Sequence, residues 1–363
     1  MKVQRVQLPP GNQYSWLVLD NEFLPVQPIL VFLQFLSNLG RSPNTIRNTA
    51  HHLKLYWEFL HEHHLEWTKV DVEELAKFIA WLRKPQLSIG EAEEWSSSRT
   101  NATIDQMLTA VHGLYDYHAR LKSGPELALY RFLSIPRRTY KPFLHGFTKA
   151  KPVRTRVVKV QREGRLVKTL RQEQVDTLLA ACAHLRDRLL LTVLFDTGMR
   201  IGQALGLRHE DVKPEDNLIH IVPRADNSNG ARAKSRRAYE VPVRPPSPVM
   251  KLYVEYVLQE LNGLEVNHLP DYVFVNLWEG ELGRPMTYAA VIALFRRLQR
   301  QTGIYVRPHM FRHTRATQWI YQNHLPLATV SRLLGHQSIQ TTHDLYVHPT
   351  TDDLRKALKQ AGE

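Results

Sequence analysis

The chain has little cysteine and no long apolar runs. Its 363 residues include a single cysteine, Cys182, which excludes an internal disulfide framework and a Cys-x-x-Cys zinc site. No apolar run approaches the ~20 residues that a membrane-spanning helix needs. The segment Met1–Leu8 lacks the apolar region of a signal peptide. We also find no internal repeat and no low-complexity segment. These absences favour a soluble, cytoplasmic protein.

Acidic residues are also scarce relative to basic ones. Lysine and arginine number 48 against 35 aspartates and glutamates, so the formal net charge is +13 and the isoelectric point is near 9.8. A positive excess of this size indicates a polyanionic partner, with nucleic acid first and an anionic membrane surface a weaker second. Hydrophobic residues make up 43%, enough for a sizeable core. At about 150 residues per domain, the length suggests two domains, or three.

The first third of the chain has helical periodicity. A short extended segment, Gln13–Asp20, comes first. Ser42 and Asp71 occupy positions typical of N-caps, and Asp71 has a glutamate three residues later, as in a capping box. The helical patterns are Pro28–Leu39, Ser42–His61, a stretch beginning at Asp71, and Thr100–Arg120. We therefore predict a mostly α-helical N-terminal domain at residues 1–125.

A basic stretch without clear periodicity follows. Between Pro136 and Gln172 lysine and arginine recur throughout, and Glu163 is the only acid. Such a stretch can be a solvated linker or a strap that lies on phosphates, and the second interpretation is favoured because it joins two folded regions of a basic protein. We predict a basic connector at residues 126–169, with Arg154 and Arg156 as candidate DNA contacts.

The remainder, residues 170–363, has the mixed pattern of an α+β domain. The predicted strands are Leu218–Val222 and Tyr239–Val243, which form a long hairpin, and Tyr272–Leu277. The predicted helices are Glu173–Cys182, Leu185–Asp196, Ser247–Leu261, Thr287–Gln301, His309–Asn323, Leu325–Leu334 and a separate last helix, Thr351–Gln360.

Two arginines, two histidines and a tyrosine stand at ordered spacings in this domain. Arg200 begins a helix after a tight turn, and His309 and Arg312 share one helix face. His336 lies just beyond a helix end, and Tyr346 follows ten residues later. Arginine binds phosphate bidentately, histidine can donate to developing oxyanions, and a tyrosine hydroxyl can act as a nucleophile. Each residue alone is ordinary, but the ordered set suits chemistry at a phosphate.

These motifs resemble those of a known family. The stretches RSPNT (41–45), NSNGARAKSRRAYEV (227–241), PHMFRHT (308–314) and LGHQSIQTTHDLYVHP (334–349) are similar to the tyrosine recombinases of the phage-integrase superfamily. Nearly the whole chain shares the resemblance, which is closest to the transposase A group of site-specific transposons. It implies a SAM-like core-binding domain followed by an α+β catalytic domain.

The resemblance also implies roles for individual residues. Tyr346 corresponds to the nucleophile. The catalytic arginines and histidines correspond to Arg200, His309, Arg312 and His336. Lys234 corresponds to the lysine thought to protonate the leaving 5′-hydroxyl, although the neighbouring Arg232, Arg236 and Arg237 leave that assignment open. One position departs from the family, because Gln203 replaces the acid that commonly follows the first arginine by three residues.

The implied reaction is site-specific strand exchange. Tyr346 attacks a scissile phosphodiester and leaves a 3′-phosphotyrosyl link and a free 5′-hydroxyl, without a metal, ATP or other cofactor. The expected partner is double-stranded DNA, on which protomers form a tetramer, with the helix Thr351–Gln360 docking on a neighbour. Partner recombinases of the same mobile element are also expected. Arg41, Asn44 and Arg47 are candidate DNA contacts near a helix start, where capping and solvation are the alternative role.

The sequence leaves three alternatives to a recombinase. His61-Glu62-His63-His64 raises the possibility of a metal site, but the run is not HExxH and successive histidines point to different faces of a helix. A non-catalytic DNA-binding protein is compatible with the composition, and Gln203 lends it slight support. A type IB topoisomerase would use similar tyrosine chemistry, but the helical N-terminal domain favours a recombinase.

Overall fold

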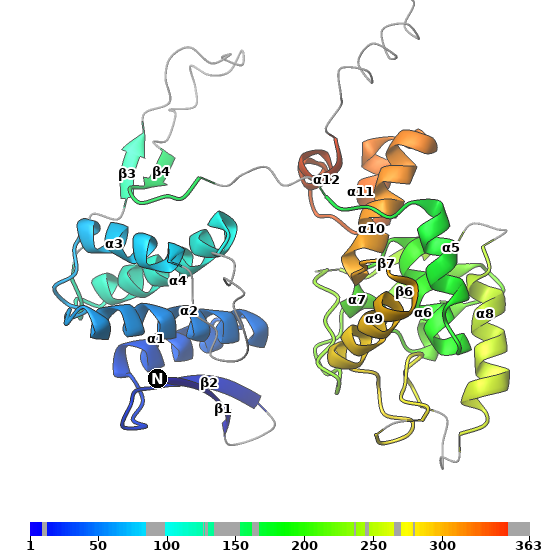
Figure 1. Ribbon diagram of the computed structural model, residues 1–363, viewed down its shortest axis with the longest axis horizontal. Coiled ribbons are helices and arrows are strands. Elements are labelled where there is room, and N and C mark those ends of the chain that lie inside the picture. Colours follow the sequence, from blue (N-terminus) through cyan, green and yellow to red (C-terminus); the bar gives the residue numbers. More distant parts are fainter. Residues whose placement is uncertain are drawn as a thin grey trace, which may run out of the picture. The chain divides into compact units, whose positions relative to one another are not determined.

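The computed structural model describes most of the chain, which separates into two compact units, Met1–Gly164 and Arg165–Glu363 (Figure 1). The described residues are 1–8, 13–84, 99–125, 127, 130–133, 153–161, 167–235, 237–243, 247–264, 270–278 and 280–347. None of the helices within these ranges is both long and apolar enough to cross a membrane. The predicted helix Thr351–Gln360, Arg236, the side chain of Arg154 and much of the basic stretch lie outside the described residues.

In its described residues, the N-terminal unit contains four helices and two small antiparallel sheets. Its helices start where their caps predict, because the Ser42 hydroxyl accepts from the backbone N–H of Thr45 and the Asp71 carboxylate from that of Glu74. The first strand was not predicted. The elements are β1 (Lys2–Leu8), β2 (Gln13–Leu19), α1 (Gln27–Asn38), α2 (Pro43–Glu62), α3 (Val72–Arg83), α4 (Asn101–Arg120), β3 (Tyr130–Leu133) and β4 (Val153–Arg156).

A cluster of aromatic side chains lies within the core of this unit. Tyr56 and Tyr115 are fully buried, and their hydroxyls lie 2.7 Å apart. The Tyr115 hydroxyl also donates to the carbonyl of Trp67 at 2.9 Å, so both buried phenols have partners. Phe59 and Phe78 pack against the Tyr56 ring. This core fixes α2 against α3 and α4, and it leaves the first half of α2 with an outward face.

The C-terminal unit surrounds a three-stranded antiparallel sheet with helices. The order of the strands is β5-β6-β7, and Ile221 pairs with Tyr239 in the predicted hairpin. The elements are α5 (Gln172–Ala180), α6 (Leu185–Thr197), α7 (Ile201–Ala204), the 3-10 turn η1 (His209–Asp211), β5 (Val212–Lys213), β6 (Leu218–Ile221), β7 (Tyr239–Pro242), α8 (Val249–Tyr256), the π turn η2 (Val257–Leu261), α9 (Tyr288–Thr302), α10 (Pro308–Thr317), the π turn η3 (Gln318–Gln322), α11 (Leu327–Leu333) and α12 (Ile339–Tyr346).

Helix α6 is the central element of this unit. It is buried on nearly all sides and packs against α8 and α10, so both of its ends are held firmly. The prediction of a strand at Tyr272–Leu277 is wrong, because this segment forms only isolated β-bridges. Val273, Phe274 and Val275 are buried, but the backbone of this segment bonds to separate loops, with Val273 donating to Leu207 and Phe274 accepting from Met286. Apolar runs of this length serve equally well as buried extended connections.

Candidate active site

The turn between α6 and α7 places Arg200. Gly198 ends α6 with a positive φ of 61°, and a Cβ there would lie 3.1 Å from the side chain of Leu334, so glycine suits both the conformation and the space. Arg200 then caps α7. Its backbone N–H donates to the Gln203 side-chain oxygen at 2.7 Å, and the Gln203 amide donates to the Tyr239 hydroxyl at 2.8 Å. Gln203 therefore connects the arginine turn to strand β7.

Arg312 connects three segments of the site. Its guanidinium, only 3% exposed, donates to the carbonyls of Gly198 at 2.7 Å and Leu334 at 2.8 Å, and to Nε2 of His336 at 2.8 Å. Because Nε2 accepts, Nδ1 of His336 carries the proton and donates to the Thr342 hydroxyl, 2.8 Å away. Burial and the neighbouring Arg312 and Arg200 lower the pKa of His336 to about 4, so its ring is neutral at pH 7.

Tyr346 ends α12 with its side chain 3% exposed. Its hydroxyl lies 3.0 Å from Nδ1 of His313, and it also interacts with Arg312 through a hydrogen bond. Burial raises the pKa of Tyr346, whereas the charges of Arg312 and Arg200 act in the opposite direction. The Tyr321 hydroxyl donates to the Tyr346 carbonyl at 3.0 Å, which fixes the end of the helix.

His313 was not singled out from the sequence. It follows Arg312 directly on α10, and its ring lies 6.3 Å from that of His309. Burial and then the nearby His309 and Arg312 lower the pKa of His313 to about 4, so it is neutral and able to accept a hydrogen bond from Tyr346. The only signal available was its place within PHMFRHT, four residues after His309.

Lys234 and His309 lie near one another on the exposed side of the site. Desolvation and then the charges of Arg312, Lys234 and Arg200 lower the pKa of His309. The segment that carries Lys234 packs tightly on α7, because a Cβ on Gly202 would lie 2.4 Å from the Arg232 carbonyl oxygen. Glycine at 202 is thus what lets this loop bring an exposed lysine to the site.

The other candidate residues lie in the N-terminal unit. Arg41, Asn44 and Arg47 are exposed at the start of α2, and the cap is supplied by Ser42 rather than by Asn44. Arg156 donates to the Thr109 hydroxyl at 2.9 Å and lies 3.8 Å from the Asp105 carboxylate, so it is engaged within its own unit.

Among the described residues, no group of three or more histidine, cysteine, aspartate or glutamate side chains could hold a metal ion. At the end of α2, Nδ1 of His63 instead lies 2.9 Å from the Phe59 carbonyl. The charges that act on the Tyr346 hydroxyl are those of Arg312 and Arg200. Such an arrangement can bind an oxyanion beside a tyrosine hydroxyl.

Two family models match this chain. The phage integrase family matches residues 168–352, and the phage integrase N-terminal SAM-like domain matches residues 29–122. The chain therefore belongs to the phage integrase family and is a tyrosine recombinase, as the motifs predicted. The expected fold class, a SAM-like helical domain with an α+β catalytic domain, is confirmed.

Relatives agree with this assignment. Transposase A from transposon Tn554 of Staphylococcus aureus is 36% identical over 98% of this chain and 96% of the relative. Tyrosine recombinase XerC of Chlamydia caviae is 31% identical over 48% of this chain and 53% of its own. Two solved structures share the fold: the Tn1549 transposon integrase with a circular intermediate DNA (TM-score 0.62, 13% identity, 92% of this chain and 99% of the other) and XerH bound to difH substrate (0.56, 20%, 94% and 86%).

Proposed function

We propose that this chain breaks and rejoins DNA strands at specific sites through a 3′-phosphotyrosyl intermediate, in the integration and excision of a mobile element. The observation that carries the proposal is a tyrosine hydroxyl held between a neutral imidazole and a buried guanidinium that has no carboxylate partner among the described residues. A nucleophile, a proton acceptor and an anion-binding group are thus adjacent.

The arginines would bind the scissile phosphate. Arg312 interacts with two carbonyls, a neutral ring and the Tyr346 hydroxyl, so no carboxylate among the described residues compensates its charge. Burial and then the charge of Arg200 lower its pKa. A phosphodiester placed beside both groups would supply the missing negative charge. The same groups would then stabilise the additional charge of the pentacoordinate transition state.

The proton transfers follow from the positions of the bases and acids. As the Tyr346 oxygen bonds to phosphorus, its proton leaves toward Nδ1 of His313, while His309 donates to a phosphate oxygen and neutral His336 holds the Arg312 guanidinium in place. The bond from phosphorus to the 5′-oxygen breaks, and the Lys234 ammonium gives that oxygen a proton. A 5′-hydroxyl from the partner strand reverses the sequence. Phosphoester energy is conserved in the tyrosyl link, so no ATP is consumed.

The proposed partner is duplex DNA. The Tn1549 integrase and XerH structures are complexes with DNA, and the +13 charge of this chain suits the same polyanion. We assign DNA contacts to Arg41, Asn44 and Arg47 and to the basic connector, within domains at residues 1–125, 126–169 and 170–363. Tetramers on two DNA sites in the cytoplasm, and partner recombinases of the same element, complete the proposal.

Covalent trapping tests this function. Purified protein is mixed with a nicked suicide duplex that carries the ends of the element, EDTA is added, and an SDS-resistant adduct is sought. We expect an adduct with the wild type and none with Tyr346→Phe, which should still bind the duplex. An adduct that persists in Tyr346→Phe would place the nucleophile elsewhere. Binding without an adduct, even with partner recombinases added, would instead indicate a non-catalytic DNA-binding protein.

A further inference from the structure

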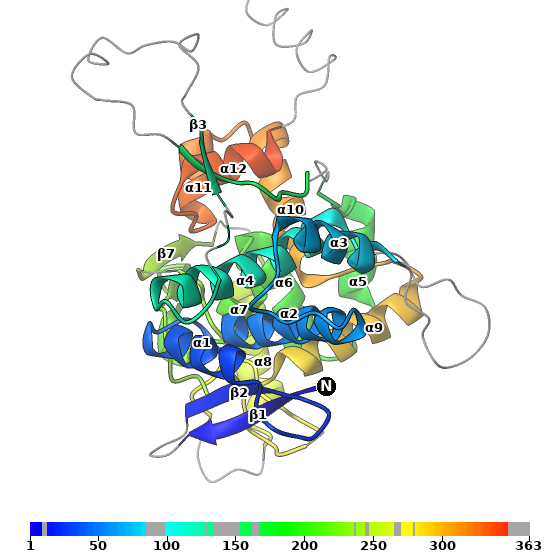
Figure 2. The same cartoon turned by 90° about the vertical axis from the view of Figure 1, so that its left-hand side faces the viewer.

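The first two strands lie outside the matched domain models. The SAM-like model begins at residue 29, whereas β1 and β2 pair over seven residues each, from Lys2 with Leu19 to Leu8 with Gln13. Figures 1 and 2 both show this hairpin lying along α1 and α2, and β2 contacts both helices. Val18 is buried in the core of the unit, so the hairpin is anchored to the bundle.

The register gives the hairpin two distinct faces. Arg5 pairs with Trp16 and Gln7 pairs with Tyr14, and because side chains alternate along a strand, these four residues share one face. Val18 is also on this face, and both Val18 and Trp16 contact the core. Lys2 lies on the opposite face, since it is an odd number of residues from Arg5.

Where this face meets α2, cations lie over aromatic rings. The Arg5 guanidinium is 3.6 Å from the centre of the Tyr14 ring, and that of Arg47 on α2 is 5.3 Å from the centre of the Trp16 ring. Arg5, Arg47 and Tyr14 are exposed. We call these four residues, Arg5, Tyr14, Trp16 and Arg47, the hairpin seam. A guanidinium resting on a ring keeps its N–H edge free for a bidentate acceptor.

The surroundings of the seam are positive. Neither strand contains an acidic residue, and none occurs between Arg41 and Trp57. In the described part of the chain, neither Arg5 nor Arg47 has an ion pair with a carboxylate. His51 lies on α2 with its ring 6.4 Å from that of Trp16. Burial and then the charges of Arg47 and Lys54 lower the pKa of His51. An anion near this surface would meet little competition.

We infer that the hairpin seam is an additional binding surface for the sugar-phosphate backbone of duplex DNA. The inference rests on the proposed function, and it extends the DNA-contacting face of α2 onto a hairpin that the SAM-like model does not include. Arg5 and Arg47 each bind one phosphate, and Tyr14 and Trp16 hold the guanidinium planes in place. These contacts are independent of base sequence, so they add affinity and salt dependence rather than site choice.

The test uses the full chain and a duplex of arbitrary sequence, with affinity measured by fluorescence anisotropy over a series of salt concentrations. Each lost phosphate contact should reduce the slope of log affinity against log salt by about 0.9, which corresponds to about fivefold weaker binding at 0.15 M salt. We expect this reduction in slope from Arg5→Gln, and about twice the reduction from the double variant Arg5→Gln with Arg47→Gln. Lys2→Gln removes the same charge from the opposite face and serves as the matched control.

Equal effects of Arg5→Gln and Lys2→Gln on the slope would overturn the inference, because the hairpin would then act only through its total charge. Unchanged melting temperatures of all variants show that the exposed substitutions leave the unit folded. The Tyr346 adduct is measured on the same preparations. If the wild type binds DNA and forms the adduct, and the salt slope of Arg5→Gln equals that of the wild type, the hairpin seam alone is rejected. If the wild type neither binds DNA nor forms the adduct, the proposed function is rejected.

Discussion

The two ends of α6 each meet a buried arginine, and the two arginines have opposite surroundings. Arg186, at the start of the helix, is 6% exposed, and Arg312, packed against its end, is 3% exposed. Arg186 donates from Nε and Nη2 to the Asp187 carboxylate at 2.9 and 2.6 Å. Arg312 instead donates to two carbonyls and a neutral histidine. In the part of the chain that the structure describes, Arg186 has a carboxylate partner and Arg312 has none.

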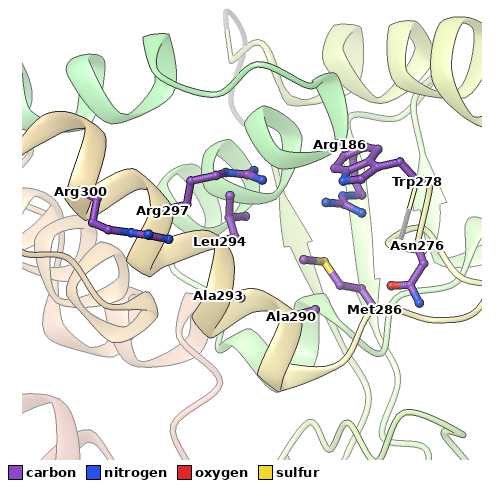
Figure 3. A pocket seen from close by; sticks show the side chains of 9 residues that line it. All are labelled: Arg186, Asn276, Trp278, Met286, Ala290, Ala293, Leu294, Arg297 and Arg300. Atoms are coloured by element: carbon purple, nitrogen blue, oxygen red, sulfur yellow. The ribbon is translucent and has the colours of Figure 1, made fainter. Parts of the chain in front are cut away.

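The Arg186 end has its own pocket, of about 250 Å³ (Figure 3). Arg186 and Trp278 lie together on one wall, with the guanidinium 4.1 Å from the ring, and Arg297 on α9 lies on the other. Arg297 donates to the second oxygen of Asp187 at 2.7 Å, so this fully buried carboxylate serves two arginines. Despite its arginines, the pocket is therefore organised around an internal ion-pair network.

The difference separates structural from functional arginine. Burial and the charge of Arg200 lower the pKa of Arg312 to about 10, which shows how unfavourable its charge is in this environment. A buried charge without a partner costs several kcal/mol, and a bound anion would offset that cost. We therefore propose that Arg186 contributes to folding, and that Arg312 binds a phosphate of the DNA.

The largest effect is expected from Arg312→Met. Loss of the guanidinium should slow formation of the Tyr346 adduct by about 10³-fold or more, by analogy with other arginines that stabilise phosphoryl-transfer transition states. Stability should change much less, because the substitution also removes a buried charge. Single-turnover adduct formation and urea unfolding measure the two effects. An adduct rate within about tenfold of wild type would contradict the role of Arg312.

The reverse pattern is expected from Arg186→Met. It leaves the buried Asp187 with Arg297 alone, so the free energy of unfolding should fall by about 3–5 kcal/mol. The adduct rate of the folded fraction should stay near that of the wild type. Arg186→Met combined with Asp187→Leu should recover part of the lost stability, because no buried carboxylate is then left short of a partner. A double variant less stable than Arg186→Met would show that the pair is not the source of the loss.

The site end of α6 should also be sensitive to acid. His336 has a pKa of about 4 in the folded chain and about 6.5 unfolded, so the unfolded state binds the proton first as pH falls. The stability that neutral His336 contributes is therefore complete above about pH 7 and is lost toward pH 4. Allowing for partial exposure, we expect about 1 kcal/mol between pH 7 and 5. Unfolding free energies at pH 7 and pH 5 measure this loss, and His336→Asn should make the unfolding free energy depend less on pH. The same pH dependence in His336→Asn and the wild type would rule out His336 as the source of the loss.

The sequence predicted the parts of the fold that depend on local signals. Ser42 and Asp71 marked helix starts because capping is a contact between residues three apart. Strand β1 was missed because Val3 and Val6 do not alternate, and its partner strand decides its conformation. Helix α12 was missed for a similar reason, since its buried side chains are few, Thr342 and Tyr346 among them.

The candidate site shows the same division. The order of Arg200, Arg312 and Tyr346 along the chain was readable because these residue types in that order are unusual. His313 was not readable, because its contact with Tyr346 spans 33 residues and exists only when α10 meets α12. Among the described residues no carboxylate pairs with Arg312, and this is likewise a property of packing.

The smallest effect is expected from Gln203→Glu, which would make the two ends of α6 more alike. The Gln203 side-chain oxygen accepts from the Arg200 backbone, and its amide donates to the Tyr239 hydroxyl. A carboxylate can accept from both groups, so the geometry should be kept while a negative charge appears near Arg200 and Arg312. We expect stability to rise by less than about 1 kcal/mol, and the increase in melting temperature produced by sulfate to shrink, because the buried charge is already partly neutralised.

Gln34→Glu adds the same charge to the exposed face of α1 and should leave the sulfate response as in the wild type. If sulfate stabilised the Gln203→Glu chain as much as the wild type, the uncompensated charge of Arg312 would not be what the anion relieves.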